Sequence, residues 1–524
     1  IINNDTSGAH TVQLKAASGS GATVTWATDD KGWKFVYFDG VATNTGVFAI
    51  GQDLSDLVVN DLTVNGELQA LGTIKLDGNY PVGTDNVALG DTALDSVEAG
   101  GTENTAIGSK AGTAITTGDD NVAVGTCALL ANTTGSRNTA IGKRALDANT
   151  DGVCNTAVGF TSLSANIGGD HNVAVGAFAL DKNTTASNNT AVGMEALKLN
   201  TTGSSLTAVG SFTLDENTTG ASNTAIGSSA LNKNTTGDFN IAVGSNALCT
   251  NTTSDNNTAV GYFSLKVNTA ANNTAVGLCS LAANTTGPDN TGVGKNALLA
   301  NTTGCRNVAV GSGALDSNTT GVQNEAIGYV ALGANTEGSC NVSLGSALGD
   351  NTTGGNNIGI GFIALSNNTT ASGNVAVGRS ALQENTTGAE NIGIGCGALK
   401  SNTTANYNVA IGGNALLDNT TGTQLVALGT AALANNTTAN ANTALGHSAM
   451  ETNTTGTANV AVGSLSLDAN TTGSNHTAVG RQALSANTTS SSNTALGGNT
   501  LATNTTGNFN TAVGYDALLS NTTA

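Results

Sequence analysis

The sequence is poor in the residues on which most globular proteins build a core and a charged surface. Of its 524 residues, 3% are aromatic, 10% are charged and only 2 are proline. A conventional core takes much of its buried area from Phe, Tyr and Trp, so this chain must bury itself with Ala, Val, Ile and Leu. Hydrophobic residues make up 39% of the chain and recur in strict register, which excludes a disordered polar tract.

Positive charge is scarce, with 17 Lys and Arg against 36 Asp and Glu, and long apolar runs are missing. The formal net charge of −19 excludes a polyanion-binding surface as the main function, so we expect no nucleic-acid partner. No apolar run approaches the length of a membrane-spanning helix and no signal peptide is visible, so we expect no membrane insertion. The chain starts at Ile1 and stops within a repeat, from which we expect a segment of a longer protein.

The cysteines do not form a recognisable framework. Their number is odd, no CxxC occurs, and no two in neighbouring repeats share a repeat position, so we expect neither a disulfide framework nor a zinc site. We interpret them as small buried or half-buried residues: Cys127, Cys154, Cys249, Cys279, Cys305, Cys340 and Cys396.

Catalytic patterns are missing as well. The sequence has no Ser/His/Asp set, HExxH motif or phosphate-binding loop, and spacing identifies no paired carboxylates. The four histidines lie far apart, and we expect His171 and His476, at turn positions, to be solvated. We therefore expect no enzyme, no cofactor and no metal. The many N-x-[ST] sequons are interpreted as corner residues rather than glycan acceptors.

What the sequence has is a repeat. The glycine that closes each N-T-A-V-G phrase serves as its anchor, from Gly90 to Gly514, and gives 26 units. The anchors are 17 residues apart, except for one spacing of 18 and two of 16 (Gly261 to Gly277 and Gly345 to Gly361). The consensus is N-[TV]-A-[VI]-G-x-x-A-L-x-x-N-T-T-G-x-x. It has no helical period, and its short β-branched stretches broken by Gly and Asn predict alternating strands and turns.

Each repeat position has a predicted role. We expect the residue before the anchor and the Leu four after it to form the apolar rows of the core. The Ala two before the anchor faces away from the Val/Ile row, so either the opposite wall of the coil or a neighbouring subunit approaches it closely. Asn is expected to take left-handed turns and to stack in amide ladders, and Gly to form the corners. The representative residues are Asn121, Ala123, Val124, Gly125, Leu129, Asn132, Gly135, Asn138, Ala140, Ile141, Gly142 and Leu146.

One coil per repeat predicts an all-β fold, a parallel β-solenoid of about 26 coils. Coils stacked about 4.8 Å apart would give a rod on the order of 125 Å long, held by contacts between neighbouring coils. So thin a coil buries little surface alone. We therefore predict a parallel homotrimer, with the small-residue face at the subunit interface.

The first 85 residues lack the repeat. Residues 1–50 alternate apolar and polar residues around Gly and Asp-Lys-Gly turns and are predicted to form a β-hairpin module. Its aromatic residues are expected to form a small core: Trp26, Trp33, Phe35, Tyr37 and Phe38. Residues 51–85 are predicted to be a connector of short strands, and residues 86–524 the repeat shaft.

The N-[TV]-A-[VI]-G-x-x-A-L phrase resembles the head repeat of trimeric autotransporter adhesins of the YadA type, which form a left-handed parallel β-roll. The longer variant with N-T-T-G, and the entry "LTVNGELQALGTIKL", resemble tail-fibre and appendage proteins of bacteriophages, marine cyanophages especially. The resemblance covers about residues 86–524 and implies a left-handed coil in a homotrimer. The chain departs from the adhesins in its 17-residue period and in showing no coiled-coil stalk or membrane anchor.

The leading functional hypothesis is a structural fibre on the virion surface. A trimeric rod would present a host-attachment tip, contact other virion or fibre proteins at its ends, and touch host surface glycans through its variable positions. A bacterial trimeric surface adhesin shares the fold but has a different location. A third hypothesis is an ice-binding solenoid, although N-T-T would point only one Thr per corner outward on a given face.

Overall fold

The computed structural model describes residues 83–523 and five short strands before them: β1 (Ile2–Asn4), β2 (Val12–Lys15), β3 (Thr23–Trp26), β4 (Gly32–Phe38) and β5 (Val47–Ile50). Two compact units are present, Ile1–Lys75 and Leu76–Ala524. In the first, β2 pairs with β3 and β4 pairs with β1 and β5, all antiparallel. The predicted aromatic core and residues 51–82 of the predicted connector lie outside what the structure describes.

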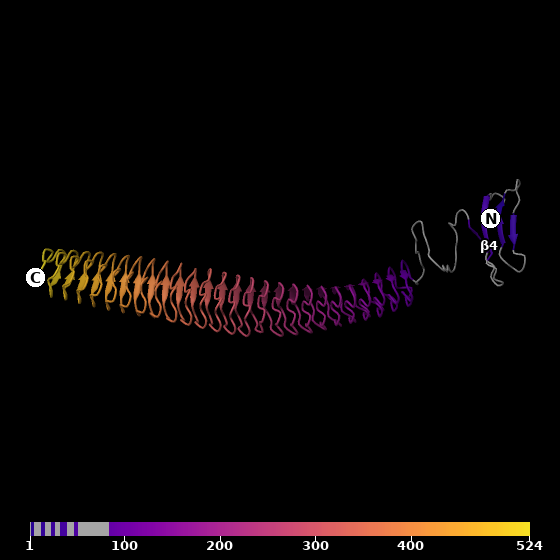
Figure 1. Cartoon of the computed structure of the whole chain (residues 1–524), viewed down its shortest axis with the longest axis horizontal. Helices are drawn as coiled ribbons and strands as arrows, with labels where there is room; N and C mark the ends of the chain where they lie inside the picture. Colours follow the sequence, from indigo (N-terminus) through magenta and orange to yellow (C-terminus); the bar gives the residue numbers. More distant parts are fainter. Residues whose placement is uncertain are drawn as a thin grey trace. The chain divides into compact units, whose positions relative to one another are not determined.

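The second unit is a β-solenoid, as the repeat predicts. Twenty-six three-residue strands stack in sequence order, and each pairs in parallel with the next (Figure 1). The strands are β6 (Val87–Leu89), β7 (Thr105–Ile107), β8 (Val122–Val124), β9 (Thr139–Ile141), β10 (Thr156–Val158), β11 (Val173–Val175), β12 (Thr190–Val192), β13 (Thr207–Val209), β14 (Thr224–Ile226), β15 (Ile241–Val243), β16 (Thr258–Val260), β17 (Thr274–Val276), β18 (Thr291–Val293), β19 (Val308–Val310), β20 (Glu325–Ile327), β21 (Val342–Leu344), β22 (Ile358–Ile360), β23 (Val375–Val377), β24 (Ile392–Ile394), β25 (Val409–Ile411), β26 (Val426–Leu428), β27 (Thr443–Leu445), β28 (Val460–Val462), β29 (Thr477–Val479), β30 (Thr494–Leu496) and β31 (Thr511–Val513).

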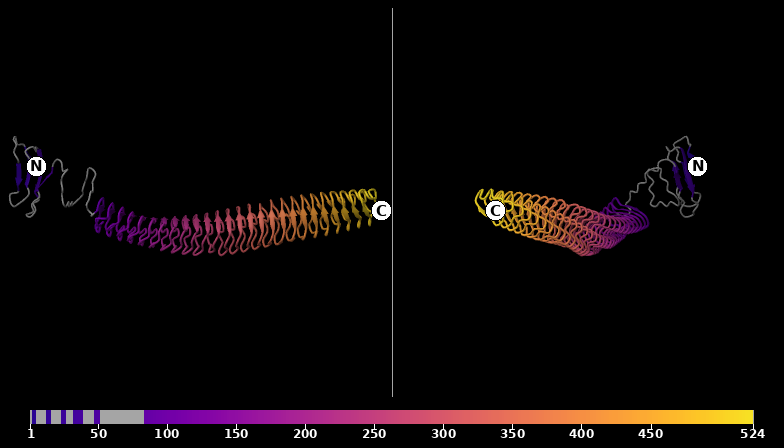
Figure 2. Two further views of the ribbon diagram at one scale, coloured as in Figure 1. Left: turned by 180° about the vertical axis from the view of Figure 1, so that it is seen from behind. Right: turned by 60° about the vertical axis from the view of Figure 1, so that its left-hand side comes forward.

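Equivalent residues of successive coils lie side by side. Ala123 pairs with Ala140, and Ala140 with Ala157, so the register follows the repeat residue for residue. Figure 2 shows that the coils keep this stacking along the whole solenoid, which curves gently. The two 16-residue spacings leave the ladder unbroken, with Ala259 opposite Ala275 and Ser343 opposite Gly359. A missing residue is therefore absorbed in the corners.

The interior of each coil holds the small residue of the strand and the Leu of the following turn. Ala140 and Leu146 have no exposed surface, whereas Ile141, between them in sequence, is 40% exposed. The predicted burial of the Leu row is confirmed, and that of the Val/Ile row, represented by Val124 and Ile141, is wrong. The strand has only three residues, so turning its middle side chain inward turns both flanking side chains outward.

The need for a small residue in the strand comes from the opposite wall of the same coil. At Gly359, which replaces the usual Ala, an added Cβ would lie 3.1 Å from the Cβ of Ala347 and 3.1 Å from Cγ of Leu348. A larger side chain would collide with that wall. The small residue therefore belongs to the chain's own core, and the prediction that it lines a subunit interface is wrong.

Two structural constraints require glycine at the anchor positions. Gly125 has φ of +131°, a region that L side chains rarely adopt. A Cβ built on it would lie 2.6 Å from the carbonyl oxygen of Gly142 in the next coil. Close stacking and backbone conformation thus both exclude a side chain here.

Left-handed backbone also occurs where the sequence does not suggest it. Three non-glycine residues in a typical coil have positive φ, for example Cys127 (59°), Leu129 (50°) and Arg137 (60°). Their amides bond to adjacent coils, since Cys127 N donates to the oxygen of Ser109 and Leu129 N to that of Ala145. The consensus Asn121 and Asn132, predicted for such turns, do not have positive φ. The coil's stacking bonds, rather than local residue preference, select these conformations.

The consensus asparagines are buried and form the predicted amide ladders. Asn149 Nδ2 donates to Oδ1 of Asn132 at 2.7 Å and to the carbonyl of Gly152 at 3.0 Å. In the second row, the backbone N–H of Asn138 donates to Oδ1 of Asn121 at 3.0 Å. The two rows run along most of the solenoid and satisfy polar groups that no water reaches.

Candidate interaction faces

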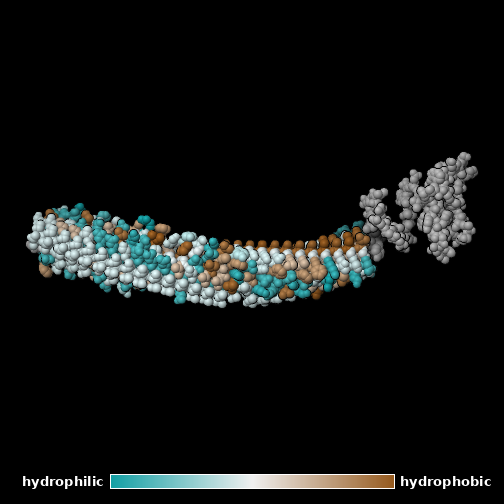
Figure 3. All heavy atoms as spheres, viewed as in Figure 1, coloured by the Kyte–Doolittle hydropathy of each residue, from teal (hydrophilic) through white to brown (hydrophobic). Residues whose placement is uncertain are grey.

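The outward-facing residues of the strands form one continuous strip of Val, Ile, Leu and Thr side chains. Its two rows are the residues before and after the central small residue, mostly Thr, Val or Ile in the first and always Val, Ile or Leu in the second. We call this the sheet strip. Glu325 is its one charged residue. Figure 3 shows evenly spaced hydrophobic side chains along one edge of the N-terminal half.

The sheet strip is a large uncovered surface in which apolar side chains predominate. Twenty-six coils at about 4.8 Å, with two outward residues spanning about 6.6 Å, give an area on the order of 800 Å². A standard protein–protein interface buries about 800 Å² per partner. The strip thus has the size and character of an interface.

The N-T-T corner carries a second regular surface. In a typical coil the first Thr is half-buried, and its hydroxyl donates to the carbonyl of the matching Thr in the next coil, as Thr302 Oγ1 does to Thr319 at 3.0 Å. The second Thr, such as Thr303, is exposed. One Thr per corner therefore faces solvent, as expected from the sequence.

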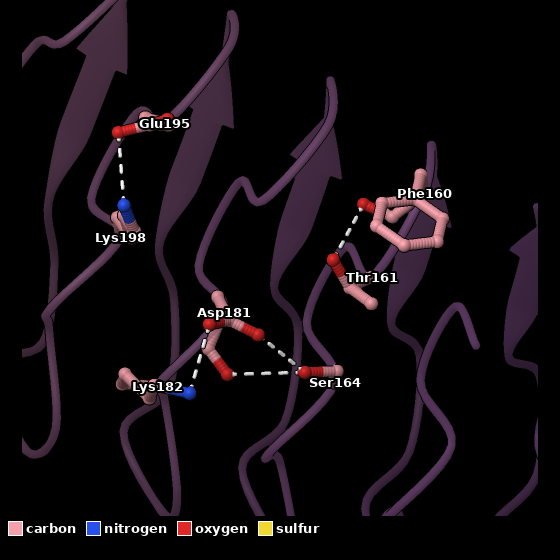
Figure 4. Close-up of polar contacts among 7 residues, drawn as sticks. All are labelled: Phe160, Thr161, Ser164, Asp181, Lys182, Glu195 and Lys198. Atoms are coloured by element: carbon pink, nitrogen blue, oxygen red, sulfur yellow. Dashed lines mark hydrogen bonds and ion pairs between the residues drawn. The ribbon is translucent and has the colours of Figure 1, made fainter. Parts of the chain in front are cut away.

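The turn after each anchor glycine is variable and carries charged and aromatic side chains (Figure 4). Asp181 accepts a hydrogen bond from Ser164 Oγ of the preceding coil and pairs with Lys182. In the next coil, Lys198 pairs with Glu195 at 2.9 Å and lies 5.9 Å from the ring centroid of Phe178. These contacts join neighbouring coils at the surface and differ from one coil to the next.

Two half-buried carboxylates on this side have few interactions that offset the cost of burying their charge. Burial raises the pKa of Asp215, and repulsion from Glu195 and Glu216 adds to the effect, although Lys198 opposes it. Burial likewise raises the pKa of Asp468. In each carboxylate the buried Oδ1 has no hydrogen-bond partner among the described residues. These acids cost stability when ionised.

The prediction that His476 is solvated is wrong. This residue stands where other coils have the ladder Asn, and it is buried rather than solvated. Its Nε2 lies 2.7 Å from the carbonyl of Ser490, and its Nδ1 accepts from the N–H of Asn493 at 3.2 Å. Burial lowers the pKa of this imidazole. His171, in contrast, is exposed as expected.

The structure also shows how exposed the cysteines and the sequon asparagines are. All seven cysteines are free, and five are half-buried, but Cys340 and Cys396 are exposed, against expectation. The Asn of the N-T-T sequon is buried in the ladder in nearly every coil, as Asn132 and Asn301 are, so the folded solenoid conceals it. This burial fits the structural interpretation of the sequons.

The structure offers no composite chemical site in its described part. Among residues 83–523 and the five N-terminal strands, no three His, Cys, Asp or Glu side chains gather as metal ligands would. The same residues include no helix with the length and hydropathy needed to cross a bilayer. The predicted repeat residues form the structural framework of the coils.

Comparisons with protein-family models, curated proteins and solved structures find no match for this chain. The regular faces of the solenoid are therefore the basis for any functional assignment.

Proposed function

We propose that the solenoid is the shaft of a structural fibre on a virion surface, assembled as a homotrimer through the sheet strip. The observation that carries this proposal is the sheet strip, whose second row is Val, Ile or Leu in every coil and which holds one charged residue, Glu325, along the shaft. A second and third copy in parallel register offer the same spacing of about 4.8 Å and the same chemistry, so equivalent coils can pack against one another throughout.

Three chains are favoured over two by the resemblance of the repeat to trimeric adhesin heads. This assembly differs from the one the sequence suggested, because Val, Ile and Thr side chains rather than alanines form the interface. In such a fibre the shaft works mechanically. Continuous hydrogen bonding between coils gives stiffness and reach, and it holds a host-attachment tip at a distance.

Substitutions in the strip test the assembly. Replacing Val310 and Ile327 by Lys places two charges at the centre of the proposed interface, and the mass in solution should fall from three chains to one. Thr303→Lys, on the exposed corner, is the matched control and should leave the trimer intact. A wild-type chain that is already monomeric would contradict the assembly.

The location is tested separately through the neighbouring genes. A virion fibre predicts genes for tail, neck or baseplate proteins beside this one. A bacterial adhesin, the alternative, predicts a C-terminal membrane-anchor barrel or an N-terminal secretion signal in the full gene. Finding the anchor would replace the virion proposal while leaving the trimer standing.

A further inference from the structure

The N-T-T corners are most regular in the C-terminal part of the solenoid. Ten successive coils carry a Thr pair at the same place, from Thr352–Thr353 to Thr505–Thr506, and we call this surface the threonine strip. In all ten, the second Thr is exposed. Stacking sets these side chains one coil apart, at about 4.8 Å.

The first Thr of nine of the ten pairs is held in one orientation by a hydrogen bond from its hydroxyl to the next coil. Thr386 Oγ1 donates to the carbonyl of Thr403 at 3.0 Å, and Thr420 Oγ1 donates to that of Thr437 at 3.0 Å. A hydroxyl fixed in this way also fixes the methyl group on the same carbon. The strip therefore presents a row of methyl groups with matching orientation beside the row of exposed hydroxyls.

Folding does not require the second Thr. Asp151, Gly168 and Glu337 occupy its place in other coils, and the strand ladder continues through them. The hydroxyls of Thr421 and Thr438 make no hydrogen bond to any described residue. Three residues further along the coil, the exposed position changes from Gln424 to Ala441 and onward without a pattern. An exposed Thr kept beside a variable row points to a surface with a role of its own.

The strip is almost free of charge. Of the five-residue segments from each Thr pair toward the next ladder Asn, from 352–356 to 505–509, only one holds a charged residue, Glu390. Figure 3 shows a continuous pale surface along the C-terminal half, the shade of residues with intermediate hydropathy such as Thr, Gly and Ser.

We propose that the threonine strip binds ice. Water at an ice surface occupies a regular lattice, and methyl and hydroxyl groups repeated at about 4.8 Å can hold water in matching order. Strongly hydrated charges would impose a different water arrangement, and the strip has nearly none. This function does not depend on the virion location, and it uses a face other than the sheet strip.

The test is partition of the full chain into a slowly growing ice hemisphere. Wild-type protein should be enriched in the ice fraction relative to an ordinary soluble protein. The double variant Thr421→Lys/Thr438→Lys puts two charges in the middle of the strip and should lower that enrichment severalfold. Exclusion of the wild type from ice would overturn the proposal.

Thr430→Lys is the matched control. Thr430 is also exposed, but it follows an anchor glycine on the variable turn, where Lys143 and Lys295 stand in other coils. This variant should enter ice as the wild type does. Thermal unfolding and sedimentation must be unchanged in both variants, which separates loss of the surface from loss of the fold. Equal enrichment of the double variant and the control would also overturn the proposal.

Discussion

Asn149 donates a hydrogen bond from Nδ2 to Oδ1 of Asn132, one coil earlier, at a distance of 2.7 Å. Both side chains are completely buried, and the relationship recurs along the solenoid. Each amide thus serves as donor and acceptor, and it also holds a backbone carbonyl of its own corner. A buried polar row of this kind stabilises only while each member is satisfied.

Breaking the ladder should open the solenoid locally. Asn385 donates to Asn368 and to the carbonyl of Gly388, and it accepts from Asn402. Asn385→Ala leaves the buried Oδ1 of Asn368 without a partner and removes one of the hydrogen bonds of Gly388 O and of Asn402 Nδ2, so it should lower the free energy of opening the surrounding coils by about 2–3 kcal/mol. Hydrogen exchange of residues 368–402 measures this loss.

Contacts are limited to neighbouring coils, so protection far from Asn385 should not change. Thr387→Ala, at an exposed position of the same corner, is the control. Unchanged exchange in Asn385→Ala would show that the amide row contributes nothing measurable.

Gly395→Ala should be among the most damaging single substitutions. Gly395 has φ of +133°, and its Cβ would lie 2.5 Å from the carbonyl oxygen of Gly412. We expect a loss of at least about 2 kcal/mol, from backbone strain and forced separation of coils. Thermal unfolding measures it. Gly413→Ala is the control, since its Cβ would meet only Thr430, at 4.0 Å, and should change stability by less than about 0.5 kcal/mol.

His476 should make one region of the solenoid sensitive to acid. Its folded-state pKa is lowered by burial, so the imidazole is neutral in both states above the ordinary value of 6.5. As pH falls below about 6.5, the opened chain takes up a proton that the folded coil resists, and stability is lost. The hydrogen-exchange protection of residues 459–493, corrected for the slower intrinsic exchange in acid, should fall over this range.

His476→Asn restores the ladder residue and should remove that acid sensitivity. His171→Asn, on the exposed surface, should leave it in place. If exchange in wild type and His476→Asn responded equally to pH, the buried imidazole would not be the cause.

Asp215 has the opposite pH dependence. Burial raises its folded-state pKa above the ordinary 3.8. Below that value the carboxyl is protonated in both states and does not lower the free energy of unfolding. As pH rises through the folded pKa, the opened chain ionises more readily and stability is lost. Asp215→Asn should therefore stabilise the coils around it at pH 7 and have little effect at pH 3.

The repeat predicted the architecture because it recurs 26 times and each position repeats its constraint. The number of coils, the parallel stacking, the Leu row and the amide ladders all followed from residue types at fixed spacing. The sequence also marked His476 as unusual, since it breaks the row of Asn at that position. Aligning it with the ladder would have predicted its burial.

The repeat could not show in the same way which side chains of the strand point into the coil. Alternation shows that Ala140 and Ile141 point to opposite sides, but not which side is the interior. The larger side chain was expected inside because burying it removes more apolar area from water. In so narrow a coil a leucine fills the space from the other wall, as Leu348 does opposite Gly359, and only a small residue fits there. The error also placed the predicted subunit interface on alanines that lie inside the coil.

Sedimentation velocity of the full chain tests the central claim most directly. The exposed sheet strip predicts a species with a mass near three times 51.3 kDa and the high frictional ratio of a rod. A single species near 51.3 kDa would mean that the strip faces solvent and would contradict the trimeric fibre.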